Sequence, residues 1–185
     1  MTYSVGFRAP SRSDLLGHFV DDILDGIPDD ELYRDPDLAR QANPGEILPD
    51  ALGRLQQMML ESLSDPASFA RWFGTFNSTP KYADMDWQPE TPLDVEDVRA
   101  NINDAVPLLR NPASRMVFIA NGDDALMLFA DGICFDCVGE TAAVAKILCA
   151  QDSVILDAAL ASAPAVVDLL TQLCNLGCIA FDSED

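Results

Sequence analysis

Histidine and positive charge are scarce in this chain of 185 residues. A single histidine excludes any catalytic site that would need several histidines from this chain. Eleven Lys and Arg residues stand against 31 Asp and Glu residues, so the formal net charge is −20. This charge argues against a broad nucleic-acid-binding face, because polyanions bind where Lys and Arg cluster. It argues equally against binding to an anionic membrane surface.

Long apolar runs are also missing, since no stretch reaches the roughly 18 residues that indicate a transmembrane helix. Residues 1–8 lack the basic start and the apolar run of a secretory signal. We therefore expect a cytoplasmic protein. Hydrophobic residues still make up 49% of the chain, which is ample for a buried core and excludes disorder of the whole chain. The length allows one domain or two small ones.

Five cysteines lie in the last third of the chain, and their odd number fits a reducing compartment better than a disulfide framework. They are Cys134, Cys137, Cys149, Cys174 and Cys178. The pairs at 134/137 and 174/178 can be read as four thiolate ligands of a zinc ion. The other interpretation is that they are small buried hydrophobes, the usual state of free cysteine. We favour the second interpretation and expect no metal site, because residues three apart in a strand point to opposite faces.

The first part of the chain is predicted to be mainly helical. Residues 1–8 alternate as a strand does, and an apolar stripe at helical spacing predicts a helix over 15–27, with Ser11 or Ser13 as its N-cap. His18 lies beside that stripe, where a lone histidine is more often a boundary residue than a ligand. A second helix is predicted from about Asp50, with its buried side formed by Leu52, Leu55, Met58 or Met59, and Leu63.

A third helix is predicted from Asp65 and Pro66, an N-cap followed by proline at the first helical position. It carries an aromatic stripe at spacings of three and four: Phe69, Trp72, Phe73 and Phe76. Such a stripe could stack nucleobases, but the acidic chain favours helix packing. Helices this apolar on one face often bury that face against a second subunit.

Residues 79–93 contain three prolines and few apolar anchors, and we interpret them as a linker between two domains. Beyond the linker, the pattern predicts a helix over 94–103, then strands over 106–109, 115–120, 125–130 and 133–138. Two hairpin signals, at residues 121–124 and at Asp131-Gly132, join the last three of these strands. Helices over 140–150, 153–161 and 164–176 follow, the last ended by Gly177, and a strand over 178–181 closes the chain.

Small strands beside a few short helices are typical of an α+β, winged-helix-like domain. A winged helix would normally suggest nucleic-acid binding, but residues 116–185 contain eleven acids, one lysine and no arginine. About −10 of the net charge thus lies in this part, with no positive helix to enter a groove. We therefore expect a protein-contact or structural role. The predicted fold class is mainly α with an α+β C-terminal part: a helical dimerisation region followed by a winged-helix-like domain.

Three stretches of the chain resemble a known family: Tyr3-Ser4-Val5-Gly6-Phe7-Arg8-Ala9-Pro10, Asp35-Pro36-Asp37 and Trp72-Phe73-Gly74-x-Phe76. They are similar to the C-terminal half of the bacterial ribosomal oxygenases, cupin-type, JmjC-like Fe(II)/2-oxoglutarate enzymes that hydroxylate an arginine of large-subunit ribosomal protein sixteen. In that family a cupin barrel is followed by a helical dimerisation region and an acidic winged-helix domain. The resemblance implies a last barrel strand at 1–8, a dimerisation region at 9–78, a linker at 79–93 and the winged-helix-like domain at 94–185.

The iron-binding triad of the family, His-x-Asp…His, is missing from the chain, because a facial triad needs two imidazoles and a carboxylate. We therefore predict no activity for this chain alone and expect it to be the back part of a longer enzyme. Fe(II) and 2-oxoglutarate are implied only for the full-length parent. Thr2 and Ser4 are candidates for the rim of the parent's pocket. No catalytic residue is expected in this chain.

The resemblance implies dimerisation and recruitment of a basic ribosomal protein, which an acidic surface would attract. The residues expected to form the dimer contact are Leu15, Leu16, Phe19, Ile23, Phe69, Trp72, Phe73 and Phe76. The alternative is a free-standing acidic adaptor or nucleic-acid mimic that binds a basic partner. A cysteine-based metal or redox module at Cys134 and Cys137 is a third hypothesis. We expect no nucleic-acid and no membrane partner.

Overall fold

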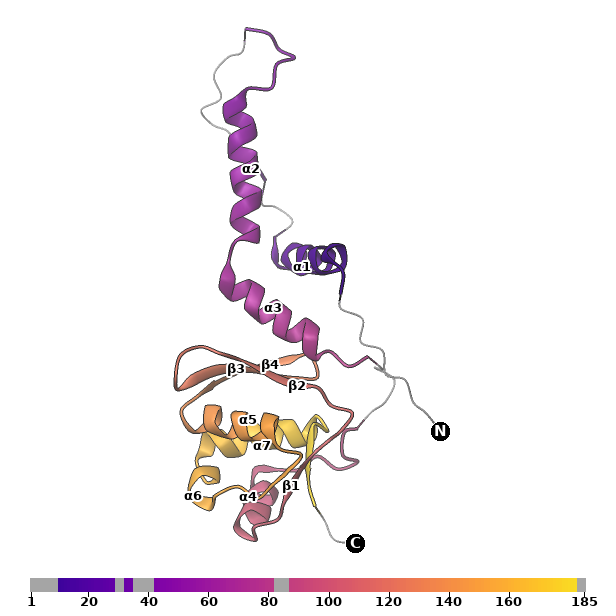
Figure 1. Cartoon of the computed structure of the whole chain (residues 1–185), viewed down its shortest axis with the longest axis vertical. Coiled ribbons are helices and arrows are strands. Elements are labelled where there is room, and N and C mark those ends of the chain that lie inside the picture. The colour runs from indigo at the N-terminus through magenta and orange to yellow at the C-terminus, as the bar shows by residue number, and fades with distance from the viewer. Residues whose placement is uncertain (1–9, 29–31, 35–41, 82–86, 183–185) are drawn as a thin grey trace. The chain divides into compact units, whose positions relative to one another are not determined.

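The computed structural model divides the chain into two compact units, Met1–Trp72 and Phe73–Asp185 (Figure 1). The structure describes residues 10–28, 32–34, 42–81 and 87–182. The strand predicted over residues 1–8, with Thr2 and Ser4, lies outside the described residues. The domain limits predicted from the sequence, including the linker at 79–93, stay predictions.

Three helices build the first unit: α1 (Arg12–Gly26), α2 (Pro49–Leu63) and the start of α3 (Pro66–Ser78), which continues into the second unit. Ser11 caps α1, because its hydroxyl accepts from Asp14 N while the Asp14 carboxylate accepts from Ser11 N, which closes a capping box. Asp65 caps α3 by accepting from Ala67 N and Ser68 N. The N-caps predicted for these two helices are confirmed.

Burial in the first unit differs from the prediction for α2. No residue of α2 is buried, and Leu52, Met58, Met59 and Leu63 are exposed. The predicted helix is correct, but its predicted buried side is wrong within a single chain. The reason is that α2 is an amphipathic helix to which the described residues of the unit offer little apolar surface.

The second unit holds, after the end of α3, four helices and six strands among its described residues. The helices are α4 (Val95–Asn103), α5 (Glu140–Ala150), α6 (Ala158–Ala161) and α7 (Pro164–Asn175). The strands are β1 (Leu108–Arg110), β2 (Met116–Ala120), β3 (Ala125–Ala130), β4 (Ile133–Val138), β5 (Ser153–Val154) and β6 (Ile179–Phe181). They form two antiparallel sheets with the strand orders β5-β1-β6 and β2-β3-β4.

The sheet β2-β3-β4 is a meander built by the two predicted hairpins. Asn121 N donates to Ala125 O at 2.8 Å across the first turn. In the second turn, Asp131 and Gly132 both have positive φ, which a tight two-residue connection requires. α5 packs against all three strands and against α7, as the lower part of Figure 1 shows.

The helix predicted over residues 153–161 is wrong in its first half. Ser153 and Val154 form β5, because Val154 pairs with Leu108 of β1, far away in the sequence. A new helix, α6, starts only after Asp157, whose carboxylate accepts from Ala159 N and Leu160 N. Tertiary pairing therefore overrides the local helical pattern here. The first predicted strand is also shifted, since β1 begins at Leu108 rather than at residue 106.

The core of the second unit lies between its helices and both sheets. Its fully buried members include Val98, Leu128, Val144, Leu170 and Ile179. They come from α4, β3, α5, α7 and β6, so one continuous core joins the two small sheets. The predicted fold class is confirmed: helices come first and an α+β part follows.

Candidate functional site

An aromatic cluster holds α1 against α3 in the first unit. The ring of Phe19 lies 4.9 Å from Trp72 and 5.2 Å from Phe69, the latter in an edge-to-face arrangement. Phe69 and Trp72 lie 5.5 Å apart. These centroid distances are those of favourable aromatic pairs. The structure thus brings together three of the eight residues predicted for the dimer contact.

The other predicted contact residues lie at intermediate or exposed positions. Leu15, Ile23, Phe73 and Phe76 are half-buried, and Leu16 is 54% exposed. Phe69 also keeps 47% of its surface exposed although its ring contacts two neighbours. Within this chain three of the eight predicted residues therefore form an aromatic cluster, and the other five are half-buried or exposed.

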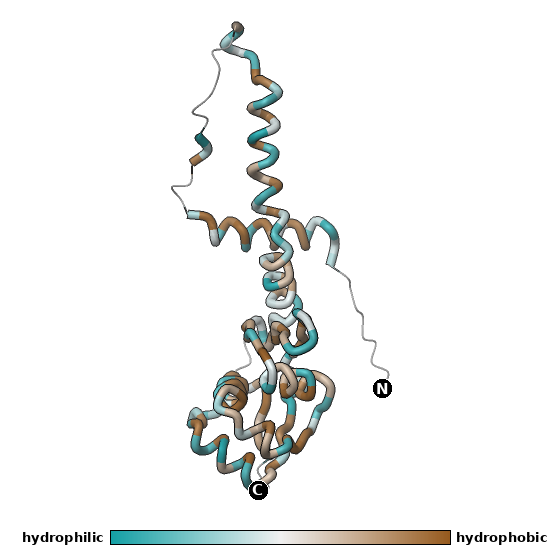
Figure 2. Tube along the Cα trace, turned by 90° about the vertical axis from the view of Figure 1, so that its left-hand side faces the viewer, coloured by the Kyte–Doolittle hydropathy of each residue, from teal (hydrophilic) through white to brown (hydrophobic). Residues whose placement is uncertain are grey.

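A larger uncovered apolar surface runs along α2. Leu52 is 55% exposed and Met59 is 63% exposed, and both lie with Leu63 at the spacings i, i+7 and i+11. This spacing places the three side chains on one side of the helix. Figure 2 shows brown apolar stretches alternating with teal ones along this helix, the upright one in the upper part of the picture. We call the set Leu52, Met59 and Leu63 the α2 stripe.

Only Phe19 and Trp72 are buried hydrophobic residues among the described residues of the first unit. A unit of about 70 residues normally needs a much larger buried core to be stable by itself. The α2 stripe and the exposed side chains of α1 are therefore unsatisfied apolar surface, of the kind that marks an interaction site.

The helix caps keep their carboxylates ionised. The side chain and the backbone N–H of Ser11 lower the pKa of Asp14 below its ordinary 3.8. The Ser68 hydroxyl, with the N–H groups of Ser68 and Ala67, lowers the pKa of Asp65 in the same way. Both carboxylates are exposed and lie at helix N-termini, where negative charge is favoured. They are part of the acidic surface and not reactive groups.

The winged-helix-like unit carries no cationic helix on its second half. Lys146 is the one lysine after residue 115, and its ammonium group donates to the carbonyl oxygen of Asp123 at 3.1 Å. It therefore holds the turn between β2 and β3. Arg110 is paired with Asp152 and also donates to the carbonyl oxygen of Cys149. Both cations are therefore engaged within the unit.

Burial makes four of the five cysteines poor nucleophiles. It raises the pKa of Cys149 to about 11 and that of Cys174 and Cys178 to about 12, and it raises the pKa of Cys137 as well. The thiolate is the reactive and metal-binding form, so these groups are protonated near pH 7. Cys137 is buried and Cys134 half-buried, and the 134/137 pair sits within β4.

No three His, Cys, Asp or Glu side chains converge as metal ligands within the part of the chain that the structure describes. His18, the one histidine, lies on α1 at an exposed position. None of the described helices is both long and apolar enough to cross a bilayer. What the described residues do offer is two kinds of interaction surface, one apolar and one acidic.

One functional candidate escaped the sequence analysis. Residues 87–93, interpreted from the sequence as part of a linker, belong to the second unit and lie against α7. Leu93 N donates to the side-chain carbonyl oxygen of Asn175 at 2.8 Å, and the Asn175 side chain donates back to Leu93 O at 3.0 Å. Trp87, Pro89 and Leu93 of this segment form one wall of a cavity. The signal available was a tryptophan in an otherwise polar, proline-rich stretch.

Comparisons with known proteins agree with this arrangement. Residues 61–180 match the family model described as ROXA-like winged helix. The chain is 34% identical, over 132 residues, to ribosomal protein uL16 3-hydroxylase of Escherichia coli (strain K12), covering 71% of this chain and 34% of that protein.

Solved structures of Escherichia coli YcfD are similar over nearly the whole chain. The X-ray structure of ycfD matches with a TM-score of 0.78 and 26% identity, over 95% of this chain and 46% of that one. The structure of YcfD, a ribosomal oxygenase, in complex with cobalt and succinic acid matches with a TM-score of 0.77 and 28% identity, over 97% and 48%. The chain therefore spans about half the length of these solved chains and about a third of the curated relative.

Proposed function

The chain belongs to the ROXA-like winged-helix family, and from this premise we propose that it serves as the non-catalytic dimerisation and recruitment part of a ribosomal protein hydroxylase. The protein that it would recruit is a basic ribosomal protein. For the curated relative, the name gives this protein as uL16.

The observation that carries the proposal is the uncovered apolar surface of the first unit. Its described residues include only two buried hydrophobic side chains, whereas the α2 stripe and Leu16 and Leu24 of α1 are exposed. A second copy of the same unit supplies a matching surface, because a two-fold contact sets the same patch against itself. Obligate dimer interfaces of this kind resemble a domain core cut in half. We therefore infer that two chains share one helical core.

The net charge supports recruitment of a basic partner. A charge of −20, divided about evenly before and after residue 116, spreads a negative potential over both units. Such a potential raises the local concentration and the association rate of a cationic protein. Lys146 and Arg110 are engaged within the second unit and leave this potential unbroken on its second half.

The iron of the enzyme family does not fit the residues of this chain. One histidine cannot supply a triad of two imidazoles and a carboxylate, and the described residues bring no three candidate ligands together. One similar structure is that of YcfD in complex with cobalt and 2-oxoglutarate, and this chain covers 48% of it. No chemical step is therefore assigned to this chain.

The experiment is a change of charge on the α2 stripe. Replacing Leu52 and Met59 together by Glu puts two uncompensated carboxylates into the proposed contact, and we expect the dimer to weaken at least about a hundredfold, at about 1.4 kcal/mol per tenfold. Gln57→Glu is the control, because Gln57 is an exposed polar residue that lies on the other side of the same helix from the α2 stripe. Sedimentation equilibrium reads the dissociation constant. Equal dimer stability in both variants would refute the assignment of this surface.

A further inference from the structure

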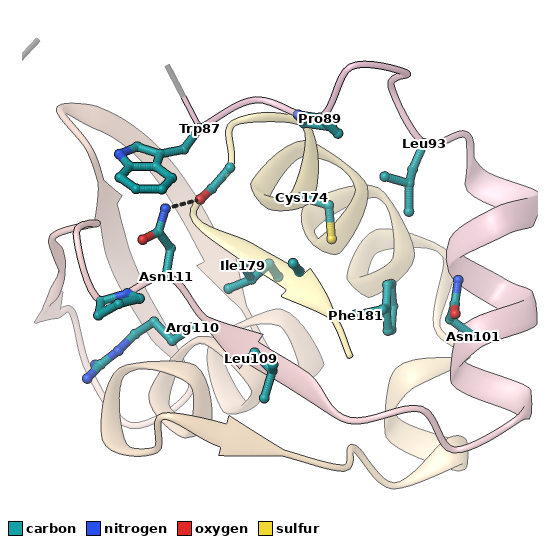
Figure 3. A pocket seen from close by; sticks show the side chains of 13 residues that line it. Trp87, Pro89, Leu93, Asn101, Leu109, Arg110, Asn111, Cys174, Ile179 and Phe181 are labelled. Carbon is teal, nitrogen blue, oxygen red and sulfur yellow. Dashed lines mark hydrogen bonds between the residues drawn. The ribbon is translucent and has the colours of Figure 1, made fainter. Parts of the chain in front are cut away.

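A cavity of about 640 Å³ lies within the second unit, between residues 87–93, the C-terminal turn of α7 and the strands β1 and β6 (Figure 3). Apolar side chains dominate its lining, among them Trp87, Leu93, Leu109 and Phe181. Its volume lies within the range of about 300–1,000 Å³ that is typical of ligand sites. Cys174, considered above as a possible zinc ligand, also lines it.

The walls of the cavity are held in place by specific contacts. Asn111 donates from its side chain to Gly177 O at 2.8 Å, the dashed line in Figure 3. Leu93 and Asn175 exchange two hydrogen bonds. Gly177 has a φ of +72°, and an added Cβ would lie 2.2 Å from the carbonyl oxygen of Trp87. The segment that carries Trp87 is thus fitted closely to the turn before β6, so the cavity is preformed.

One side of the cavity is the edge of a sheet, with which no further strand pairs among the described residues. β6 is the last strand of the sheet β5-β1-β6, and all three of its residues line the cavity. Asn111 N donates to Cys178 O, and Asp182 N donates to Pro107 O. The backbone N–H and C=O groups of residues 178 and 182 therefore point toward β1. Because these groups alternate along a strand, those of Ile179 and Phe181 point away from β1. An extended peptide can pair with such groups.

The surroundings of the cavity are acidic. Glu90 and Asp182 adjoin the lining residues Pro89 and Phe181 in the chain, and Asp97 lies one helical turn before the lining residue Asn101. All three carboxylates belong to exposed residues. The lining cation, Arg110, is paired with Asp152 and the carbonyl oxygen of Cys149. A cationic ligand is therefore favoured over an anionic one.

Arg99 is the other cation of this region. It lies on α4 two residues before Asn101, which is about 200° around a helix, and it lines a separate small cavity with Ile102 and Val167. It therefore does not offset the carboxylates around the larger cavity.

We propose that this cavity and the outer edge of β6 bind an extended segment of a basic protein by strand addition. Apolar side chains of the segment enter the cavity, and the alternate Lys or Arg side chains face Glu90, Asp97 and Asp182. The proposal rests on the proposed function, since it names the site at which a basic protein is recruited. It adds the chemistry of the recognised segment, which alternates apolar and basic residues.

Trp87 reports on the binding directly. It is 52% exposed at one end of the cavity, whereas Trp72, the other tryptophan, is buried. In a Trp72→Phe background, a synthetic nonapeptide of alternating arginine and valine is expected to shift the emission of Trp87 to the blue. The same peptide with all of its amides N-methylated is expected to bind at least about tenfold more weakly, because neither of its edges can donate backbone hydrogen bonds to the strand edge. Equal binding of the two peptides would overturn the strand-addition proposal.

A matched pair of variants locates the site. Ala180→Arg introduces a cation at an exposed residue of β6 that lines the cavity, and Ala120→Arg introduces the same side chain at an exposed residue of β2, in the other sheet. We expect Ala180→Arg to weaken the nonapeptide at least about tenfold and Ala120→Arg to change it little. Equal effects of the two variants, or none, would overturn the proposal.

Binding of intact uL16 separates this proposal from the proposed function. If the wild-type chain binds uL16 in a salt-sensitive manner and Ala180→Arg binds it equally well, recruitment stands and the cavity proposal fails. If the nonapeptide binds as described and the wild-type chain does not bind uL16, the cavity proposal stands and recruitment fails. Loss of uL16 binding in Ala180→Arg but not in Ala120→Arg supports both.

Discussion

A glycine inside α3 is expected to tolerate no side chain. Gly74 lies in the part of α3 that belongs to the second unit, and a Cβ added there would come within 2.3 Å of Cε2 and Cζ of Phe129. The ring of Phe129 is fully buried in β3 and has no free space to move into. Ordinarily Gly→Ala in a helix interior stabilises by about 1 kcal/mol. Overpacking of a filled core costs about 1–3 kcal/mol, occasionally more.

Because a contact of 2.3 Å requires a large displacement, we expect Gly74→Ala to lower the free energy of unfolding by about 2 kcal/mol net, a decrease of about 5–10 °C in Tm. Phe129→Val removes Cδ2, Cε2 and Cζ, the three ring atoms that lie within 2.5 Å of the added Cβ. In that background Gly74→Ala should become neutral or stabilising by up to about 1 kcal/mol, so the double-mutant cycle measures the contact itself. Urea unfolding of the four proteins gives the cycle.

The control for helix propensity is Gly53→Ala in α2, where an added Cβ meets nothing within 4 Å. We expect this variant to gain helical ellipticity. The reasoning would be refuted if Gly74→Ala stabilised the wild-type protein as Gly53→Ala stabilises its helix. It would also be refuted if Gly74→Ala cost the same with Val at position 129 as with Phe.

Two further predictions concern the second unit. Burial raises the pKa of Cys174 and Cys178 to about 12 from an ordinary 9.0, so the stability that their protonation contributes is complete below pH 9 and is lost as the pH rises toward 12. An Ellman titration should therefore label these two thiols only when the protein unfolds. Rapid labelling of the native protein at pH 8 would contradict this prediction. Replacing Asn175 by Ala leaves the backbone N–H and carbonyl of Leu93 without these partners. We expect the free energy of unfolding, measured by chemical denaturation, to fall by about 1–3 kcal/mol. An unchanged denaturation midpoint would show that residues 87–93 do not pack as described.

Local sequence signals predicted most of the elements correctly. Ser11 and Asp65 predicted the starts of two helices, and Gly177 predicted the end of α7. The turn residues at 121–124 and at Asp131-Gly132 predicted the two hairpins. These signals depend on neighbouring residues only, so they can be read without a tertiary structure.

Features that depend on distant partners could not be predicted from the sequence. β5 exists because Val154 pairs with Leu108, and without this pairing residues 153–154 follow the helical pattern of their neighbours. The cavity beside β6 depends on Leu93 and Asn175, which are 82 residues apart in the sequence. The burial predicted for α2 presupposed a partner surface that the described residues of one chain do not provide.

The most direct test of the central proposal, that two copies of this chain share one helical core, is the mass of the chain in solution. The chain has a mass of 20.1 kDa, so two chains have a mass of 40.2 kDa. Light scattering coupled to size exclusion, over about a hundredfold range of protein concentration, should give the mass of two chains at the upper end of that range. A mass of 20.1 kDa at every concentration would contradict the account.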